Sequence, residues 1–272
     1  MTLQVREHIT NTVAKTGDRS CSVLMSSGID SHSVLFSCLD AGLKPVITSF
    51  TLDDRESRDF RAARHAAAYF DLEFRPVVLS TDLTKLKKRV LQMARLGVKG
   101  KTAFECLWPM FTAFSAIKED VVFSGYGADA YFALSKRGTM HYKDDVSKYA
   151  LEAFEKYKEP DSQLNVLKAF AAKRGITYAP PWLNKHITRQ VRERVFTWDE
   201  LNRPKQKNPV REQYAEYLAG CMVYNHVNYQ LGDSGISELF TKLLDDPVWN
   251  AAGYKSTTGI FNSVVRGEIT QV

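Results

Sequence analysis

The fold is decided by the stretch Cys21-Ser22-Val23-Leu24-Met25-Ser26-Ser27-Gly28-Ile29-Asp30-Ser31. Its first five residues form a short apolar run, which predicts a buried β-strand. A polar loop follows, and residues 32–40 then show the apolar spacing of a helix that Gly42 closes as its C-cap. A strand that passes through a tight polar loop into a helix suits phosphate binding, because a helix N-terminus presents unpaired N–H groups and a partial positive charge.

The segments on either side of this stretch alternate between predicted helices and predicted strands. Residues 2–16 form an amphipathic helix with apolar positions at Leu3, Ile9 and Val13. Further strands are predicted at residues 45–50, 74–79 and 120–123, and further helices at residues 56–70, 83–96 and 104–118. The alternation predicts an α/β protein with a doubly wound parallel sheet. From residue 141 the pattern is mostly helical, so we expect an α/β core over residues 1–140 and a helical part over residues 141–272 of the same structural unit.

Composition restricts the classes of protein that the chain can represent. The 272 residues are 44% hydrophobic and 25% charged, which is enough to bury one sizeable core. The net charge of +6 suits a polyanionic ligand; a nucleoside triphosphate explains it, and nucleic acid is the less favoured interpretation. The four cysteines form no C-x-x-C pair, so we expect no zinc site and reduced thiols. Without a signal segment or a membrane-spanning run, we expect a cytoplasmic protein that does not enter a membrane.

The loop over residues 26–31 contains groups that bind phosphate and a divalent cation. Gly28 lets the backbone approach a phosphate closely, and the hydroxyl groups of the three serines can donate hydrogen bonds. Asp30 suits Mg²⁺, which takes one or two carboxylates together with phosphate oxygens. The alternative is a plain turn that caps the next helix. The loop is neither a Walker A loop nor a G-x-G-x-x-G fingerprint.

A second strand also runs into a glycine-rich turn that carries a carboxylate. The predicted strand at residues 120–123 is followed by Ser124-Gly125-Tyr126-Gly127-Ala128-Asp129. In a doubly wound sheet both loops lie at the carboxyl ends of strands, where ligands bind. Asp30 and Asp129 are therefore interpreted as a pair that holds a magnesium–pyrophosphate group. The alternative role for Asp129 is a helix N-cap.

The two loops resemble motifs of a known family. Residues 26–31 are similar to the S-G-G-x-D-S signature of the N-type ATP pyrophosphatases, or PP-loop enzymes, with Ser27 in place of a glycine. Residues 124–129 resemble the S-G-E-G-x-D-E loop of the asparagine synthetases. Ser49-Phe50 and the alanine-rich helix after it also fit the synthetase domain. Weaker similarities occur at Ala179-Pro180-Pro181-Trp182-Leu183, which resembles R-V-P-F-L, and at residues 228–236, which resemble a late loop that carries a catalytic lysine.

The resemblance implies an adenine nucleotide alpha hydrolase-like fold and an ATP-dependent ligase. Such an enzyme adenylates a carboxylate and transfers the acyl group to an amine or to ammonia, releasing AMP and pyrophosphate. The helical part over residues 141–272 would complete the acyl-substrate site. ATP and Mg²⁺ are the implied cofactors, with Asp30 and Asp129 as metal ligands. The implied ATP-binding residues are Met25, Ser26, Ser27, Gly28, Ile29, Asp30, Ser31, Ser49, Phe50, Ser124, Gly125 and Gly127.

Two departures from the family pattern bear on the nitrogen donor and on proton transfer. The chain begins Met1-Thr2 and enters its ATP domain at once, so we expect no glutaminase domain; ammonia, a separate glutaminase or another amine would supply nitrogen. Tyr126 replaces the glutamate of the second loop and resembles the tyrosine of the β-lactam synthetases. It would deprotonate an amine if its pKa were lowered, with Glu152, Glu155 or Glu159 as partner. Alternatively, Tyr126 is an aromatic residue that shapes the pocket.

A third departure concerns the family lysine. His226 stands at its aligned position, and a histidine is a weaker, pH-dependent cation. Lys205 or Lys207 could reach the phosphates instead, although the two are also interpreted as part of a solvated basic loop.

The sequence is also compatible with two other functions. One is a PP-loop enzyme that modifies a nucleic-acid base by adenylation, which the basic helix at residues 83–96 would allow. The other is a nucleotide-binding protein without catalysis, against which the presence of both aspartates argues.

Overall fold

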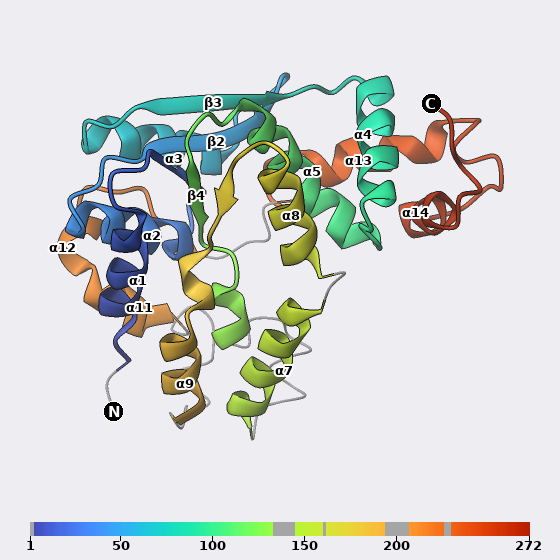
Figure 1. Ribbon diagram of the computed structural model, residues 1–272. Coiled ribbons are helices and arrows are strands. Elements are labelled where there is room, and N and C mark those ends of the chain that lie inside the picture. Colours follow the sequence, from blue (N-terminus) through green and yellow to red (C-terminus); the bar gives the residue numbers. More distant parts are fainter. Residues whose placement is uncertain (1–2, 133–144, 160–161, 194–206, 226–229) are drawn as a thin grey trace.

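The computed structural model describes residues 3–132, 145–159, 162–193, 207–225 and 230–272. Its centre is a five-stranded sheet in which every pair of neighbouring strands is parallel (Figure 1). The strands are β1 (Cys21–Leu24), β2 (Val46–Leu52), β3 (Phe74–Leu79), β4 (Val121–Ser124) and β5 (Thr177–Tyr178). Their order is β3-β2-β1-β4-β5, so the winding direction changes between β1 and β4. In doubly wound sheets, ligands bind at this switch point, outside the carboxyl ends of the strands.

Two apolar clusters, one on each side of the sheet, hold the helices. The first includes side chains of α1 (Val5–Val13), α2 (Ile29–Asp40), α3 (Arg58–Tyr69), α9 (Lys185–Glu193) and α11 (Asn208–Gln213). The second includes side chains of α4 (Leu83–Arg95), α5 (Lys101–Ala116), α8 (Gln163–Ala172), α13 (Ile236–Thr241) and α14 (Thr257–Val265). The other described α-helices are α7 (Val146–Lys158) and α12 (Ala215–Leu218). The layered arrangement confirms the prediction of an α/β fold with a doubly wound parallel sheet.

Most of the predicted elements are present near their predicted bounds. Leu3, Ile9 and Val13 are buried, as the amphipathic pattern of the first helix requires. Strand β3 has the predicted bounds, and α5 begins three residues before the predicted helix. Strand β5 is new, and it comes from the part of the chain that was expected to be mostly helical. It pairs with β4 through Thr177 and Tyr178, opposite Val121 and Val122.

The cysteines and the lengths of the described helices complete the description of the fold. All four cysteines are free, and Cys21 and Cys38 are buried. Burial raises the pKa of both thiols, which makes them poor nucleophiles. Within the described ranges, no helix has the length and apolar character needed to cross a bilayer.

Candidate active site

The loop between β1 and α2 is held in shape by its own serines. The Ser31 hydroxyl lies 3.1 Å from the hydroxyl of Ser26 and accepts a hydrogen bond of 3.1 Å from the Ser26 amide. The Ser26 hydroxyl also accepts from the Gly28 amide at 3.3 Å. Gly28 is the N-cap of α2, so Asp30 and Ser31 stand in the first turn of the helix. The amides of such a turn have no partners in their own helix and can bind an anion.

Ser27 is fixed by contacts that the sequence motif did not reveal. Its amide donates to Asp59 Oδ1 at 2.8 Å, and its hydroxyl donates to the same oxygen atom. Its carbonyl accepts a hydrogen bond of 2.9 Å from the amide of Tyr224. Asp59 lies in the first turn of α3, where the sequence showed only a helical residue. Ser27, which replaces a glycine of the signature, therefore ties the loop to α3 and to the segment that contains Tyr224.

His32 fixes the first turn of α2 from inside the protein. Its side chain is fully buried, and Nδ1 donates to the carbonyl oxygen of Gly28 at 2.9 Å. Burial lowers the pKa of His32 to about 4, so the ring is neutral at pH 7. Nε2 is also buried and has no hydrogen-bond partner among the described residues. No sequence signal pointed to His32, since histidine is common on buried helix faces.

The second loop packs directly against the first. A β-carbon added to Gly125 would lie 2.7 Å from Cβ of Asp30 and 2.8 Å from the amide nitrogen of Ser31. Gly127 has φ +96° and lies against the side chain of Leu183, so it too must be a glycine. Asp129 follows in a short 3₁₀ helix over Ala128–Tyr131, where no side chain caps the first turn. Among the described residues, the N-cap of this helix is Gly127 rather than Asp129.

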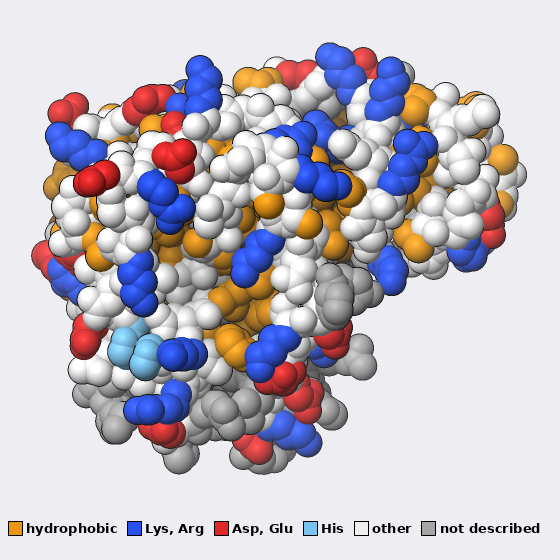
Figure 2. Space-filling view, viewed as in Figure 1, with side chains coloured by type: hydrophobic (Ala, Val, Ile, Leu, Met, Phe, Trp, Pro, Cys, Tyr) orange, Lys and Arg blue, Asp and Glu red, His pale blue; other side chains and the backbone are white. Residues whose placement is uncertain are grey.

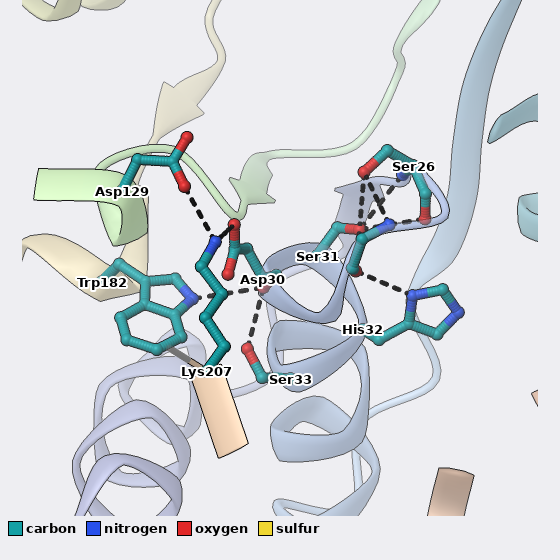
Figure 3. Close-up of polar contacts among 9 residues, drawn as sticks. Ser26, Asp30, Ser31, His32, Ser33, Asp129, Trp182 and Lys207 are labelled. Carbon is teal, nitrogen blue, oxygen red and sulfur yellow. Dashed lines mark hydrogen bonds and ion pairs between the residues drawn. The ribbon is translucent and has the colours of Figure 1, made fainter. Parts of the chain in front are cut away.

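Lys207 joins the two loops through their carboxylates (Figure 3). Its ammonium nitrogen lies 2.8 Å from Asp129 Oδ1 and also forms an ion pair with Asp30 Oδ2. The residue is only 4% exposed. Burial alone lowers the pKa of Lys207, but the two carboxylates outweigh it and the pKa is raised, which keeps the side chain charged. Our interpretation of Lys207 as part of a solvated basic loop was wrong, because α11 places it beneath both loops.

The backbone of Asp30 is held on two further sides. Its carbonyl oxygen accepts from the Trp182 indole at 3.2 Å and from the Ser33 hydroxyl at 2.8 Å (Figure 3). Trp182 belongs to the segment that resembled R-V-P-F-L, so that weak motif has a structural role at the first loop. Arg211 of α11 is a second cation near Asp30. Burial lowers the pKa of Arg211, and the charge of the Asp30 carboxylate offsets part of that effect.

The remaining residues predicted to bind ATP lie within β2, at Ser49 and Phe50, and at the end of β4, at Ser124. Ser49 of β2 donates to the carbonyl of Met25 at 2.9 Å. Phe50 is partly buried against the apolar cluster on the α5 side. The hydroxyl of Ser124 lies 2.7 Å from the hydroxyl of Tyr178 and accepts from the Tyr126 amide at 3.2 Å. The structure thus brings the predicted residues of both loops together at the switch point of the sheet.

Tyr126 does not have the environment that proton abstraction requires. Burial raises its pKa well above the ordinary value, and the neighbouring Tyr157 and Tyr178 raise it further. The ring of Tyr126 packs against that of Tyr157, with centroids 5.6 Å apart. Of the candidate partners, Glu155 is exposed and pairs with Lys158 at 2.6 Å. The lowered pKa that a general base would need is absent, and the pocket-shaping interpretation fits the structure.

The donor atoms at the two loops fit a magnesium ion. Carboxylates of Asp30 and Asp129 reach the same ammonium nitrogen, so both also lie within reach of one cation. The described residues contain no cluster of three or more His, Cys, Asp or Glu side chains that could hold a metal. Two carboxylates with phosphate oxygens and water match the usual coordination of Mg²⁺. Two predicted catalytic residues, Lys205 and His226, lie outside the described residues and stay predictions.

Fold and site together define an α/β protein with two acidic, glycine-containing loops that meet at the switch point of a parallel sheet. Comparison with family models narrows this class. The model described as asparagine synthase matches residues 4–219, which includes both loops and Lys207. The chain therefore belongs to the asparagine synthase family, which consists of ATP-dependent amide-forming ligases. Residues 228–236, interpreted above as the late lysine loop, lie outside the match. A search of curated proteins found no match to the chain.

Proposed function

We propose that this protein activates a carboxylate with ATP and transfers the acyl group to an amine or ammonia, releasing AMP and pyrophosphate. The observation that carries the proposal is the arrangement of Lys207 between Asp30 of the first loop and Asp129 of the second. Family membership supports the ATP-dependent ligase class, and the similarity of residues 26–31 to the ATP pyrophosphatase signature favours cleavage between the α and β phosphates.

The first loop binds the phosphates through the amides at the start of α2. Gly28 leaves room above this turn, and the serine network fixes the direction of the N–H groups. Because His32 and Asp59 hold the loop before ATP arrives, the loop loses little entropy on binding. Gly125 brings the second loop close enough for Asp129 to act on the same group as Asp30.

Asp30 and Asp129 would hold magnesium when it binds with ATP. Lys207, which pairs with both carboxylates here, would then be available to the oxygens of the departing pyrophosphate. When bound, Mg²⁺ neutralises charge on the phosphate oxygens and makes pyrophosphate a better leaving group. Lys207 adds a second positive charge at the group that departs, and such stabilisation of developing charge often contributes more to catalysis than any other effect.

The chemistry proceeds in two substitutions. A carboxylate oxygen of the substrate attacks the α phosphorus, the bond to the bridging oxygen breaks, and pyrophosphate leaves with that electron pair. The nitrogen nucleophile then attacks the acyl carbon, loses a proton, and AMP leaves with the carboxylate oxygen. Tyr126 shapes the side of the pocket where the acyl group lies. Lys205 and His226 stay proposed as further cations for these steps.

Product analysis tests the proposal. The protein is incubated with ATP, Mg²⁺, pooled amino and dicarboxylic acids, and ammonium or simple amines, and the nucleotides are separated by ion-exchange chromatography. We expect AMP and pyrophosphate in equal amounts, and Asp30→Asn to lower their formation by about 10²-fold or more while circular dichroism shows an intact fold. Formation of ADP and phosphate, or full turnover by Asp30→Asn, would contradict the assignment.

A further inference from the structure

The excess positive charge of this protein is concentrated in two short segments. Residues 83–95 and 162–178 carry eight Lys and Arg side chains and no Asp or Glu. The whole chain has a formal charge of +6, so the rest of the molecule has a net charge of −2. An ATP molecule at the two loops does not explain why the positive charge is concentrated in these segments. Neither α4 nor α8 contributes to the contacts of the two loops described above.

The two segments meet on one side of the molecule. Helices α4 and α8 both pack against α5, and Figure 2 shows Lys and Arg side chains gathered over this region. Arg174, just after α8, lies close enough to Arg89 of α4 for its charge to act on that guanidinium group. We use the term basic surface for Lys85, Lys88, Arg89, Arg95, Lys173 and Arg174.

The side chains of the basic surface are available to a partner. Arg89 is half-buried, whereas the other five are exposed. Among the ion pairs between described residues, none involves a member of the basic surface; Arg89 instead donates to Gln92 at 2.7 Å. Arg174 is held with its guanidinium carbon 3.7 Å from the centroid of the Phe170 ring. Two neighbouring arginines without carboxylates between them are electrostatically unfavourable unless an anion joins them.

The geometry of α4 suits an extended chain of phosphates. Lys85, Lys88 and Arg95 lie at helical spacing on its outer face, while Leu86, Val90 and Met93 face the core. Ten residues of α-helix span about 15 Å, the length of four to five phosphates along one strand of a duplex. None of the exposed large apolar side chains of the described residues lies on α4 or α8. Stacking platforms for unpaired bases are therefore absent from this surface.

We propose that the basic surface binds a nucleic-acid duplex through its phosphate backbone, without reading its sequence. This interaction is independent of the ligase activity, because no member of the basic surface belongs to the two loops or to Lys207. It would hold the enzyme at a nucleic acid, while the two loops, which lie elsewhere on the protein, carry out the ligase chemistry.

A paired charge-reversal experiment tests this proposal. Fluorescence anisotropy with a labelled DNA duplex of about 20 base pairs is measured over a series of salt concentrations for the full-length protein. We expect log K to fall linearly with log salt. Lys85→Glu with Lys88→Glu should bind at least tenfold more weakly and lose about 1.8 from the slope, which corresponds to two phosphate contacts. The control is Lys15→Glu with Lys44→Glu, which changes the charge equally at two exposed lysines elsewhere.

The outcomes separate the proposal from its competitors. The proposal is supported if the α4 variant loses affinity for the duplex and the control variant retains it. Both variants should keep the melting temperature and the ATP–pyrophosphate exchange rate of the wild type. Equal loss in both variants would show attraction by net charge alone and overturn it. Tighter binding to single strands or to polyglutamate than to the duplex, or no duplex binding at low salt, would overturn it as well.

Discussion

Lys207 is a charge that the protein buries at considerable cost. An isolated ammonium group in the interior would lose its hydration and give up its proton. Two carboxylates prevent this, and they belong to the two loops that are proposed to hold magnesium. The ammonium group therefore occupies the place that a cation would take, so the acidic pair is compensated before any ligand arrives.

Removing Lys207 tests this competition between ammonium and metal. In Lys207→Met the ammonium no longer opposes a divalent cation, so we expect the nucleotide-free protein to bind Mn²⁺ at least tenfold more tightly, measured by electron paramagnetic resonance. AMP formation should fall by about 10²- to 10³-fold, because the charge that stabilises the leaving pyrophosphate is lost. Lys15→Met, at an exposed position, is the control. Unchanged Mn²⁺ affinity in Lys207→Met would refute the competition.

His32 makes stability depend on pH from about 6.5 downward, which is above the pH at which carboxylates begin to titrate. Its pKa in the folded protein is about 4, below the ordinary value of 6.5, because the ring is buried. The unfolded chain therefore takes up this proton first as the pH falls, and the folded state is destabilised below pH 6.5. Asp40 and Asp246 have lowered pKa values, so their effects appear only at more acidic pH.

His32→Asn should remove that pH dependence. An asparagine amide can still donate to the Gly28 carbonyl, but it has no proton to gain. We expect the wild type to lose up to about 3 kcal/mol more than the variant between pH 6.5 and pH 4, measured by urea unfolding. If the two free energies of unfolding fall in parallel over this range, His32 does not titrate as described.

At the scale of elements, the site depends on the close approach of two loops from neighbouring strands. β1 and β4 are adjacent and in register, with Leu24 opposite Ser124. The chain therefore leaves both strands at the same level, and only a glycine at position 125 lets the second loop pass the first turn of α2. The spacing between Asp30 and Asp129 follows from this contact.

Alanine substitutions separate the packing role of one glycine from the binding role of another. Gly125→Ala would place its β-carbon against the backbone of α2, so we expect a loss of about 1–3 kcal/mol in the free energy of unfolding. In Gly28→Ala the added β-carbon would lie 3.5 Å from the Ser26 hydroxyl, and the negative φ of this residue suits alanine, so stability should change little. The variant should still bind ATP more weakly, because its methyl group would lie over the first turn of α2, where the phosphates are proposed to bind. Calorimetry measures both quantities; equal stability of the two variants would contradict the packing argument.

The C-terminal elements support the sheet from outside the family match. Lys87 of α4 forms a buried ion pair with Asp246, and its ammonium lies 5.9 Å from the centroid of the Trp249 ring. The Asp246 carboxylate also accepts from the Trp249 amide at 2.9 Å. These contacts fix α4 against the segment after α13, and so they fix the helix that carries most of the basic surface.

At the scale of the whole molecule, the sequence predicted the elements well because each is a local pattern. Apolar runs marked β1 to β4, and helical spacing marked α1 to α5. β5 has only two residues, which is too short to produce a run, and it is defined by its pairing with β4. The two loops could be predicted to meet, since both follow parallel strands.

Contacts between distant residues were beyond prediction from one sequence. Nothing local distinguishes Lys207 from a solvated lysine, because its burial depends on two aspartates far away in the chain. The bond between Ser27 and Asp59 depends in the same way on how α3 packs. The raised pKa of Tyr126 was likewise out of reach, because it follows from burial and from aromatic neighbours that only the fold assembles.

The separation of Lys207 from its partner also has a consequence during synthesis on the ribosome. Asp30 and Lys207 are 177 residues apart. At about 5–20 residues per second, roughly 9 to 35 s pass between the emergence of the two residues. For that interval the nascent chain carries the acidic loop without its lysine, and a soluble cation is then its available counter-charge. The loop over residues 26–31 can fold early, but the site is complete only when the last third of the chain, which contains Lys207, has been made.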